Sequence, residues 1–199
     1  MNEVLRQEKK YPIDLAQGAA LRARLDQIMR RDAHNGAQGY TIRSLYFDTP
    51  DDEDFHDKVD GLELRRKLRL RAYSPDADFA MLEMKQKEGP YQKKRSLRLS
   101  REDAVRLCQG DYGPLKSYPD PFAGECYGLM ACRCYRPKAI VEYLRQAYLA
   151  QENHIRITLD SRITATETCF DLFSARLPQF PVMDPFRMVL EVKYNGFLL

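Results

Sequence analysis

Residues 61–73 alternate aliphatic and charged side chains, which is the clearest pattern in the sequence. Successive side chains of an extended strand point to opposite faces, so one face of this segment carries leucines and the other carries charges. A helix would scatter the same cations around its axis, so the pattern predicts a β-strand. The leucines are Leu62, Leu64, Leu68 and Leu70, and the charged residues are Glu63, Arg65, Lys67, Arg69 and Arg71, with Arg66 breaking the alternation.

The same alternation recurs along the chain and predicts about eight strands. They are residues 3–11 (ended by Pro12), 40–47, 62–73, 79–87, 91–99, 138–149, 154–160 and 187–194, with a further short strand or hairpin within 162–173. Most of these strands place charged residues on one face and aliphatic residues on the other. The charged sets are Arg6, Glu8 and Lys10; Glu83, Lys85 and Lys87; Lys93 and Arg95; Arg156 and Asp160; Glu191 and Lys193.

Helices are predicted where the apolar spacing changes to that of a helix. Asp14 is a suitable N-cap for a helix over residues 15–31, and Ser100 with Asp103 resembles a capping box that opens a helix ending near residue 108. Residues 110–135 are rich in Gly, Pro, Tyr and Cys and predict an irregular insert with one helix near 122–131. The acidic stretch 51–57 is expected to be a solvated loop rather than a lid.

Together these elements predict an α+β fold: a closed or nearly closed antiparallel β-barrel of about eight strands with helices packed outside. No repeat, low-complexity segment or linker divides the sequence. We therefore expect a single domain over residues 1–199, with residues 110–135 as its insert.

Composition narrows the classes of protein. Hydrophobic residues make up 44% of the 199 residues and charged residues 31%, and no stretch is apolar enough to cross a bilayer. An odd number of cysteines, five, without a signal-peptide pattern indicates reduced thiols and a cytoplasmic location. Cys126, Cys132 and Cys134 lack a second C-x-x-C and a nearby His, which disfavours zinc. No histidine lies beside a Ser or Cys nucleophile motif, which leaves a catalytic triad without support.

The net charge of only +3, from 32 basic and 29 acidic residues, means that an anion site requires charges to be sorted in space. The charged strand faces allow two interpretations, a solvated outer surface or the lumen of a wide barrel. Lys and Arg regularly placed next to Glu favour the lumen, because the cations bind phosphate oxygens and carboxylates hold Mg²⁺ or Mn²⁺. Phosphoryl transfer needs mainly positioning and charge stabilisation, which such a lumen offers.

Seven short motifs follow one another along nearly the whole chain. They are Glu8-Lys9-Lys10-Tyr11, Ile42-Arg43-Ser44-Leu45-Tyr46-Phe47-Asp48, Lys67-Leu68-Arg69-Leu70-Arg71, Leu82-Glu83-Met84-Lys85, Lys93-Lys94-Arg95, Tyr143-Leu144-Arg145 and Val189-Leu190-Glu191-Val192-Lys193. No motif is diagnostic by itself, but in this order they resemble the VTC domain (vacuolar transporter chaperone type), a member of the triphosphate tunnel metalloenzyme or CYTH-like superfamily.

The resemblance implies an antiparallel β-tunnel that uses Mn²⁺ or Mg²⁺ to make polyphosphate from ATP or another nucleoside triphosphate. It implies phosphate contacts by Lys10, Arg69, Arg71, Lys85, Lys93, Arg145 and Arg156, with further ligand contacts by Arg43, Arg95 and Lys193. Glu191 matches the metal-binding glutamate of the family, with Glu8 and Glu83 as further candidates. The family typically continues into a helical segment with another basic Lys-Tyr motif, whereas this sequence stops at Leu199, which leaves processive polymerisation an open question.

Other functions remain open at this point. Tripolyphosphate or a nucleotide could be hydrolysed in the same tunnel, and a non-catalytic polyphosphate-binding module would show the same charged strands. We do not expect nucleic acid as a partner, because aromatic side chains are not interleaved with the cations as stacking platforms require.

Overall fold

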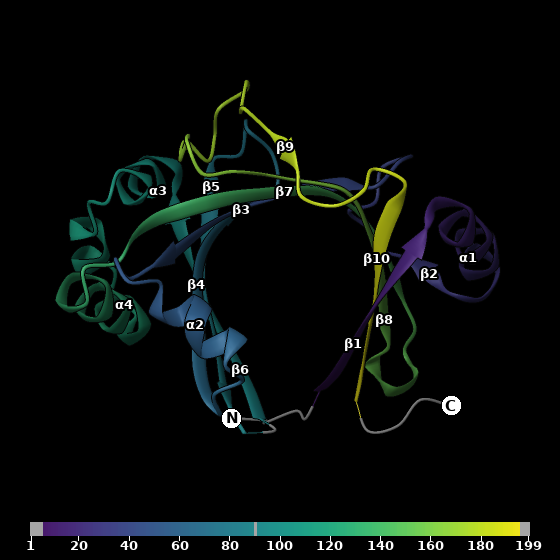
Figure 1. The fold of residues 1–199 in the computed structure, drawn as a ribbon, viewed down its shortest axis with the longest axis horizontal. Coiled ribbons are helices and arrows are strands. Elements are labelled where there is room, and N and C mark those ends of the chain that lie inside the picture. The colour runs from purple at the N-terminus through teal and green to yellow at the C-terminus, as the bar shows by residue number, and fades with distance from the viewer. Residues whose placement is uncertain (1–5, 90, 196–199) are drawn as a thin grey trace. The chain divides into compact units, whose positions relative to one another are not determined.

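The computed structural model of the protein describes residues 6–89 and 91–195, and Figure 1 labels its helices and strands. Residues 3–5 of the first predicted strand lie outside the described residues. No helix in the described ranges has the length and apolar character needed to span a membrane.

In the described residues, ten strands form one sheet, and the pairs β1–β10, β10–β8, β2–β7, β3–β4, β4–β5 and β5–β6 are antiparallel. The main order is β1-β10-β8-β7-β3-β4-β5-β6, with β2 paired to β7 and β9 to β8. Along the described strands, no hydrogen-bonded pair links β6 back to β1. The strands are β1 (Arg6–Asp14), β2 (Arg30–Arg31), β3 (Tyr40–Asp48), β4 (Leu64–Ala72), β5 (Phe79–Glu88), β6 (Tyr91–Ser100), β7 (Arg136–Leu149), β8 (Arg156–Thr166), β9 (Phe180–Pro181) and β10 (Arg187–Asn195).

The helices confirm the predicted caps and show that the fold is α+β. The Asp14 carboxylate accepts the backbone N–H of Gln17 at 2.7 Å, and the hydroxyl of Ser100 accepts that of Asp103 at 3.1 Å. The helices are α1 (Leu15–Ile28), α2 (Glu53–Val59), α3 (Arg101–Cys108) and α4 (Pro121–Cys132), with short 3-10 helices at Gly113–Ser117 (η1) and Glu152–His154 (η2). The helix predicted near 122–131 is therefore present as α4.

Three boundaries differ from prediction. Strand β1 continues through Pro12 to Asp14, because β1 lies at the end of the strand order, where a missing N–H costs no sheet hydrogen bond. The first predicted helix ends at Ile28, and Arg30–Arg31 pair with β7 instead. Residues 162–166 continue β8, so no separate short strand begins there.

The acidic stretch 51–57 is also not the loop that was predicted, since α2 begins at Glu53. The carboxylate of Asp48 accepts the backbone N–H groups of Asp54 and Phe55 at 2.9 and 3.0 Å. These N–H groups belong to the first turn of the helix, where no partner exists within the helix itself. Asp48 lies at the end of β3 and therefore stabilises α2 from outside the helix.

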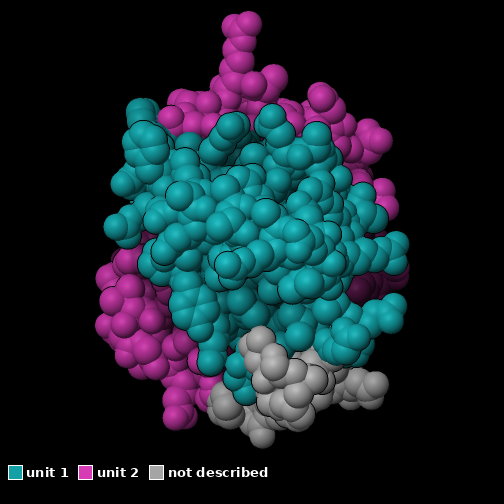
Figure 2. All heavy atoms as spheres, turned by 90° about the vertical axis from the view of Figure 1, so that its right-hand side faces the viewer, with its two compact units in different colours: residues 1–42, 142–164, 180–199 teal, residues 43–141, 165–179 magenta. Residues whose placement is uncertain are grey.

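Contacts divide the chain into two compact units, coloured separately in Figure 2. Unit 1 comprises residues 1–42, 142–164 and 180–199, and unit 2 comprises residues 43–141 and 165–179. Each unit has its own hydrophobic core, which we describe separately. That residues 1–199 form a single domain stays a prediction.

The core of unit 2 lies between the aliphatic face of β4–β5 and the helices α3 and α4. Leu68, Leu70 and Leu82 are fully buried there, together with Leu107 of α3 and Met130 of α4. In Figure 1 both helices lie on the same side of β4–β6. The prediction that Leu68 and Leu70 pack under helices is confirmed, and the opposite face of these strands is left for the charged side chains.

The core of unit 1 lies between α1 and the aliphatic faces of β8 and β10. Leu25 of α1 packs with Leu159 and Met188. At Gly18 of α1, an added Cβ would lie 2.2 Å from the sulfur of Met188, so glycine is needed for this close approach. In unit 1 as well, a helix covers the aliphatic face of the sheet.

Candidate functional site

Strand register gathers the charged residues of unit 2 on one face of the sheet. Side chains directly opposite each other in an antiparallel pair point to the same side. The register opposes Arg69 to Glu83, and Lys85 to both Lys67 and Lys94. The resulting unit 2 polar face consists of Ser44, Tyr46, Lys67, Arg69, Arg71, Glu83, Lys85 and Lys94.

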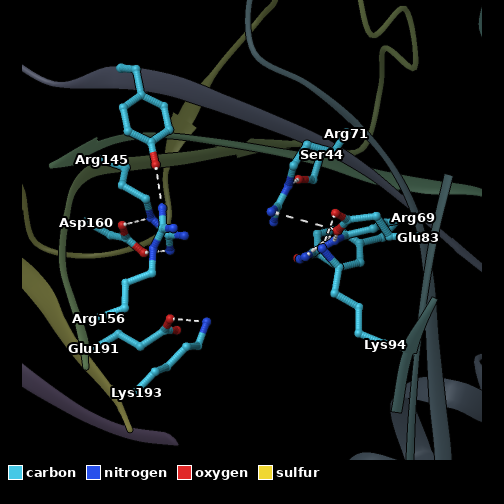
Figure 3. Close-up of polar contacts among 12 residues, drawn as sticks. Ser44, Arg69, Arg71, Glu83, Lys94, Arg145, Arg156, Asp160, Glu191 and Lys193 are labelled. Atoms are coloured by element: carbon cyan, nitrogen blue, oxygen red, sulfur yellow. Dashed lines mark hydrogen bonds and ion pairs between the residues drawn. The ribbon is translucent and has the colours of Figure 1, made fainter. Parts of the chain in front are cut away.

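Glu83 is the centre of this face (Figure 3). Its carboxylate accepts the Nε–H of Arg69 at 2.8 Å, lies 2.6 Å from Nζ of Lys94 and is 3.8 Å from Nη1 of Arg71. The side chain is only 2% exposed. Burial by itself raises a carboxyl pKa, but Arg71, Arg69 and Lys94 outweigh that effect and lower the pKa of Glu83 to about 2. Three cations thus share one ionised carboxylate, which leaves the cluster positive.

Hydroxyl groups of β3 fix the two arginines further. Nη1 of Arg69 donates to the hydroxyl of Tyr46 at 3.1 Å, and Nε of Arg71 donates to the hydroxyl of Ser44 at 3.3 Å. Burial raises the pKa of a tyrosine, yet the positive charge of Arg69 brings the pKa of Tyr46 below its usual value. Both guanidinium groups are therefore buried, charged and held from more than one side.

The opposite face of the same strands carries Lys93, Arg95 and Arg43. Lys93 pairs with Gln86 and Arg95 with Met84, both on the face turned toward the helices. Arg95 binds the carboxylate of Glu125 of α4, at 2.6 Å through Nη2, and stacks over the ring of Phe122. Arg43 pairs with Ala72 and donates to the carbonyls of Leu172 and Ser174 at 3.0 and 2.7 Å.

This placement separates the three residues of the basic run in β6. Lys94, and not Lys93 or Arg95, shares a face with Glu83. Arg43 and Arg95 hold a loop and a helix in unit 2, so neither is part of the candidate site. Three consecutive basic residues necessarily occupy both faces of a strand, and the sequence pattern did not show which face was covered.

The charged residues of unit 1 also share one face. The register opposes Glu8 to Lys193 and Lys10 to Glu191, and on the other side of β10 it opposes Glu191 to Thr158 and Lys193 to Arg156. Asp160 of β8 shares this face and binds Arg145 of β7. The unit 1 polar face therefore consists of Glu8, Lys10, Arg145, Arg156, Thr158, Asp160, Glu191 and Lys193.

Glu191 is held by two lysines and is 3% exposed. Nζ of Lys10 lies 3.1 Å from Oε2, and Lys193 forms an ion pair with Oε1. The same two ammonium groups lie 3.3 and 3.5 Å from the carboxylate of Glu8. Burial opposes ionisation of Glu191, but Lys193, Lys10 and Arg145 bring its pKa down to about 2. Two carboxylates and two lysines thus alternate on neighbouring strands.

Two further arginines of this face are fixed by carboxylates. Arg145 and Asp160 form a buried bidentate pair, with both N–H···O distances at 2.6 Å (Figure 3). Burial alone lowers the pKa of an arginine, but Asp160 raises that of Arg145 and keeps the side chain charged. Arg156 lies 2.9 Å from the carboxylate of Asp32 and donates to the hydroxyl of Tyr40 at 3.2 Å.

The oxygen donors near Glu191 fit a hard divalent cation. Oγ1 of Thr158 is buried without a hydrogen-bond partner among the described residues, and Oε1 of Glu191 contacts Lys193 as an ion pair without hydrogen-bond geometry. Mg²⁺ prefers one or two carboxylates together with water and phosphate oxygens, and Mn²⁺ also suits oxygen donors. No group of three or more potential Asp, Glu, His or Cys ligands occurs in the described part of the chain. Cations surround both Glu191 and Glu83, and the unpartnered Oγ1 of Thr158 is what favours Glu191; Glu83 as a metal ligand stays a prediction.

Some residues of these faces were not predicted as site residues. Lys94, Ser44 and Tyr46 in unit 2 and Thr158 and Asp160 in unit 1 join the predicted cations through strand register. Thr158 and Asp160 lie two and four residues after Arg156 in the same strand, so alternation alone places them on its face. Ser44, Tyr46 and Lys94 join their faces only through pairing with neighbouring strands. Lys10, Arg69, Arg71, Lys85, Arg145, Arg156, Lys193, Glu191, Glu8 and Glu83 all lie on one or other polar face.

Solved structures share this fold. A candidate adenylate cyclase from Bacillus halodurans has a TM-score of 0.57 at 13% identity, over 96% of this chain and 82% of that one. A candidate adenylate cyclase from Vibrio parahaemolyticus has a TM-score of 0.54 at 13% identity, over 98% and 78%. A candidate adenylyl cyclase from Hippeastrum, described as having a dominant triphosphatase activity, has a TM-score of 0.59 at 11% identity, over 96% and 79%.

The chain therefore shares the fold of these solved structures. The family model of the VTC domain matches residues 5–198, and the chain belongs to this family. A comparison with curated protein sequences gives no match.

Proposed function

We propose that this protein is a divalent-metal-dependent phosphotransferase that binds a nucleoside triphosphate and extends inorganic polyphosphate. The observation that carries the proposal is the cluster around Glu83, where Arg69, Arg71 and Lys94 are held by a single buried carboxylate. Such a cluster attracts a polyanion, because its positive charge exceeds its negative charge. Membership of the VTC family supports the choice of polyphosphate as product.

Arg69 and Arg71 are suited to bind phosphate oxygens. Glu83, Tyr46 and Ser44 engage only part of each guanidinium, which leaves other N–H groups as donors. A guanidinium presents its donors in a planar fork that matches two phosphate oxygens. Since these side chains are already fixed, little conformational entropy is lost on binding, and the same groups stabilise charge as it develops during transfer.

In unit 1, Lys10, Lys193, Arg145 and Arg156 have the corresponding role. We propose that Glu191 and Glu8 hold Mn²⁺ or Mg²⁺ with Thr158, on the basis of their oxygen donors described above. Such an ion would offset the negative charge of the phosphates during transfer. Lys10 and Lys193 keep Glu191 ionised, and the bidentate contact with Asp160 orients Arg145.

Hydrolysis is the second candidate function, with water as the acceptor of the phosphoryl group. The triphosphatase activity of the Hippeastrum protein supports it for a protein of the same fold. Binding of polyphosphate without turnover is the remaining alternative. The three functions share the phosphate contacts and differ in what happens to the terminal phosphoryl group.

Incubation of the protein with ATP and Mn²⁺ distinguishes them. We expect a ladder of polyphosphate on a polyacrylamide gel; orthophosphate alone would indicate the hydrolase, and binding without any product would indicate the binding module. Lys94→Ala should reduce product formation, whereas Lys93→Ala, on the other face of the same strand, should not. Equal activity of both variants and the parent protein would overturn the assignment of the unit 2 polar face.

A further inference from the structure

A cavity of about 510 Å³ lies in unit 2 beside helix α2. Its walls come from α2, from the end of β3, from the middle of β4, from the start of β7 and from the loop that holds Glu167. The volume is within the range of small-molecule sites, which is about 300–1,000 Å³. All the residues that line the cavity belong to unit 2.

The cavity adjoins the unit 2 polar face through two shared residues. Tyr46 and Lys67 line the cavity and are also members of that face. The hydroxyl of Tyr46 accepts the hydrogen bond from Arg69. A ligand whose phosphates contact Arg69 can therefore place a neighbouring chemical group in the cavity.

Aromatic surface is the main feature that the cavity offers a ligand. Phe55 of α2 lines it and is 56% exposed, so its ring is accessible to a ligand in the cavity. Tyr46 supplies a second ring. Flat π-systems of this kind bind flat heterocycles by stacking, a contact worth roughly 1–3 kcal/mol for a nucleic-acid base.

The acidic residues of the wall are mostly committed to other contacts. Asp48 accepts backbone N–H groups of α2, and Asp54 accepts the hydroxyl of Tyr135 at 2.8 Å and lies 3.2 Å from Nε of Arg66. Asp52 lies 2.5 Å from Nζ of Lys138. These contacts make the wall less negative than its composition indicates, so a neutral ring with a phosphate tail is compatible with it.

We propose that this cavity binds the nucleoside part of the nucleoside triphosphate, with the base against Phe55 and the α-phosphate toward Lys67. The inference rests on the proposed function for the phosphate contacts, but it concerns a different part of the ligand. Contact between the nucleoside and the cavity makes the protein bind a nucleotide more tightly than inorganic polyphosphate of equal charge. The nucleoside contact also directs the triphosphate toward Arg69.

Calorimetric titration with three ligands tests the nucleoside site in the cavity separately from the phosphate contacts of the polar face. Adenosine alone reports on the cavity, inorganic tripolyphosphate reports on the phosphate contacts, and ATP reports on both. We expect Phe55→Ala to weaken ATP binding roughly tenfold or more and to remove the weak binding of adenosine, with tripolyphosphate affinity unchanged. Phe55→Tyr, which keeps the ring, should bind like the parent protein.

Val59→Ala is the matched control, because Val59 is an exposed residue of the same helix and does not line the cavity. It should bind all three ligands normally. Absence of adenosine binding to the parent protein, or equal loss of ATP and tripolyphosphate affinity in Phe55→Ala, would overturn the inference. Failure of tripolyphosphate to bind the parent protein would instead overturn the proposed function, and adenosine would still decide the role of the cavity.

Discussion

Nζ of Lys94 lies 2.6 Å from Oε1 of Glu83, across the β5–β6 pair. The neighbouring Lys93 points from the opposite face of β6, beside Gln86. Both lysines are exposed to solvent. They differ in their neighbours, because Lys94 contacts Glu83 and Lys93 lies beside Gln86. This pair of adjacent lysines offers a direct test of which sheet face binds phosphate.

Lys94→Ala should weaken tripolyphosphate binding roughly tenfold, the cost of losing one charge-assisted contact. Lys93→Ala should change the affinity by less than about twofold, since Lys93 lies away from the cluster. Calorimetric titration at a fixed ionic strength measures both. If Lys93→Ala had the larger effect, the phosphate-binding face would be the one covered by α3 and α4, contrary to our assignment.

Glu83→Gln should lower the free energy of unfolding by about 3–5 kcal/mol, because it leaves buried Arg69 and Arg71 without their carboxylate. Denaturation in urea measures the loss, and tripolyphosphate should recover more stability in the variant than in the parent protein. The control is Glu125→Gln, which breaks the exposed pair with Arg95 and should cost at most about 1 kcal/mol. Similar losses in both variants would show that the Glu83 cluster has no special energetic role.

Thr158→Val should raise the free energy of unfolding by about 1 kcal/mol, because the buried hydroxyl has no hydrogen-bond partner in the described structure and costs desolvation. The same substitution should weaken Mn²⁺ binding in the presence of tripolyphosphate, as followed by electron paramagnetic resonance. Thr164→Val, which removes a hydrogen bond to the carbonyl of Glu142, serves as control and should lower stability without changing Mn²⁺ binding. Unchanged Mn²⁺ affinity in Thr158→Val would remove Thr158 from the metal site.

Asp54 should make the stability of the protein depend on pH. Burial raises its pKa from 3.8 to about 6, with neighbouring Asp48 and Asp57 acting in the same direction and Tyr135 and Arg66 opposing it. The folded state then holds the proton to a higher pH than the unfolded chain does. Relative to Asp54→Asn, the parent protein should therefore lose about 3 kcal/mol of stability as the pH rises from about 4 to about 6.

Urea denaturation of both proteins between pH 4 and pH 7 measures this difference. Asp51→Asn, at an exposed position just before α2, should show a pH dependence parallel to that of the parent protein. A difference between the parent protein and Asp54→Asn that stays constant over this range would mean that Asp54 titrates normally.

Short-range pattern predicted most of the strands and the helix caps. Asp14 and Ser100 act on backbone groups three residues away, so the sequence is sufficient to find them. Helix α2 was missed because its stabilising carboxylate, Asp48, lies outside the helix and at the end of a strand. Pro12 was taken as the end of β1 because the edge position of that strand is a property of the sheet and not of the segment.

The alternation in residues 61–73 determined by itself that this protein has strands with one aliphatic and one charged face, since side chains of a strand alternate wherever the strand lies. It also placed Arg69 and Arg71 together. Only the tertiary structure decided that Glu83, Tyr46 and Ser44 hold these arginines, and that Lys94 replaces Lys93 beside them. The reason is that register and helix cover join residues distant in sequence, and a one-residue shift in register would turn every side chain to the other face.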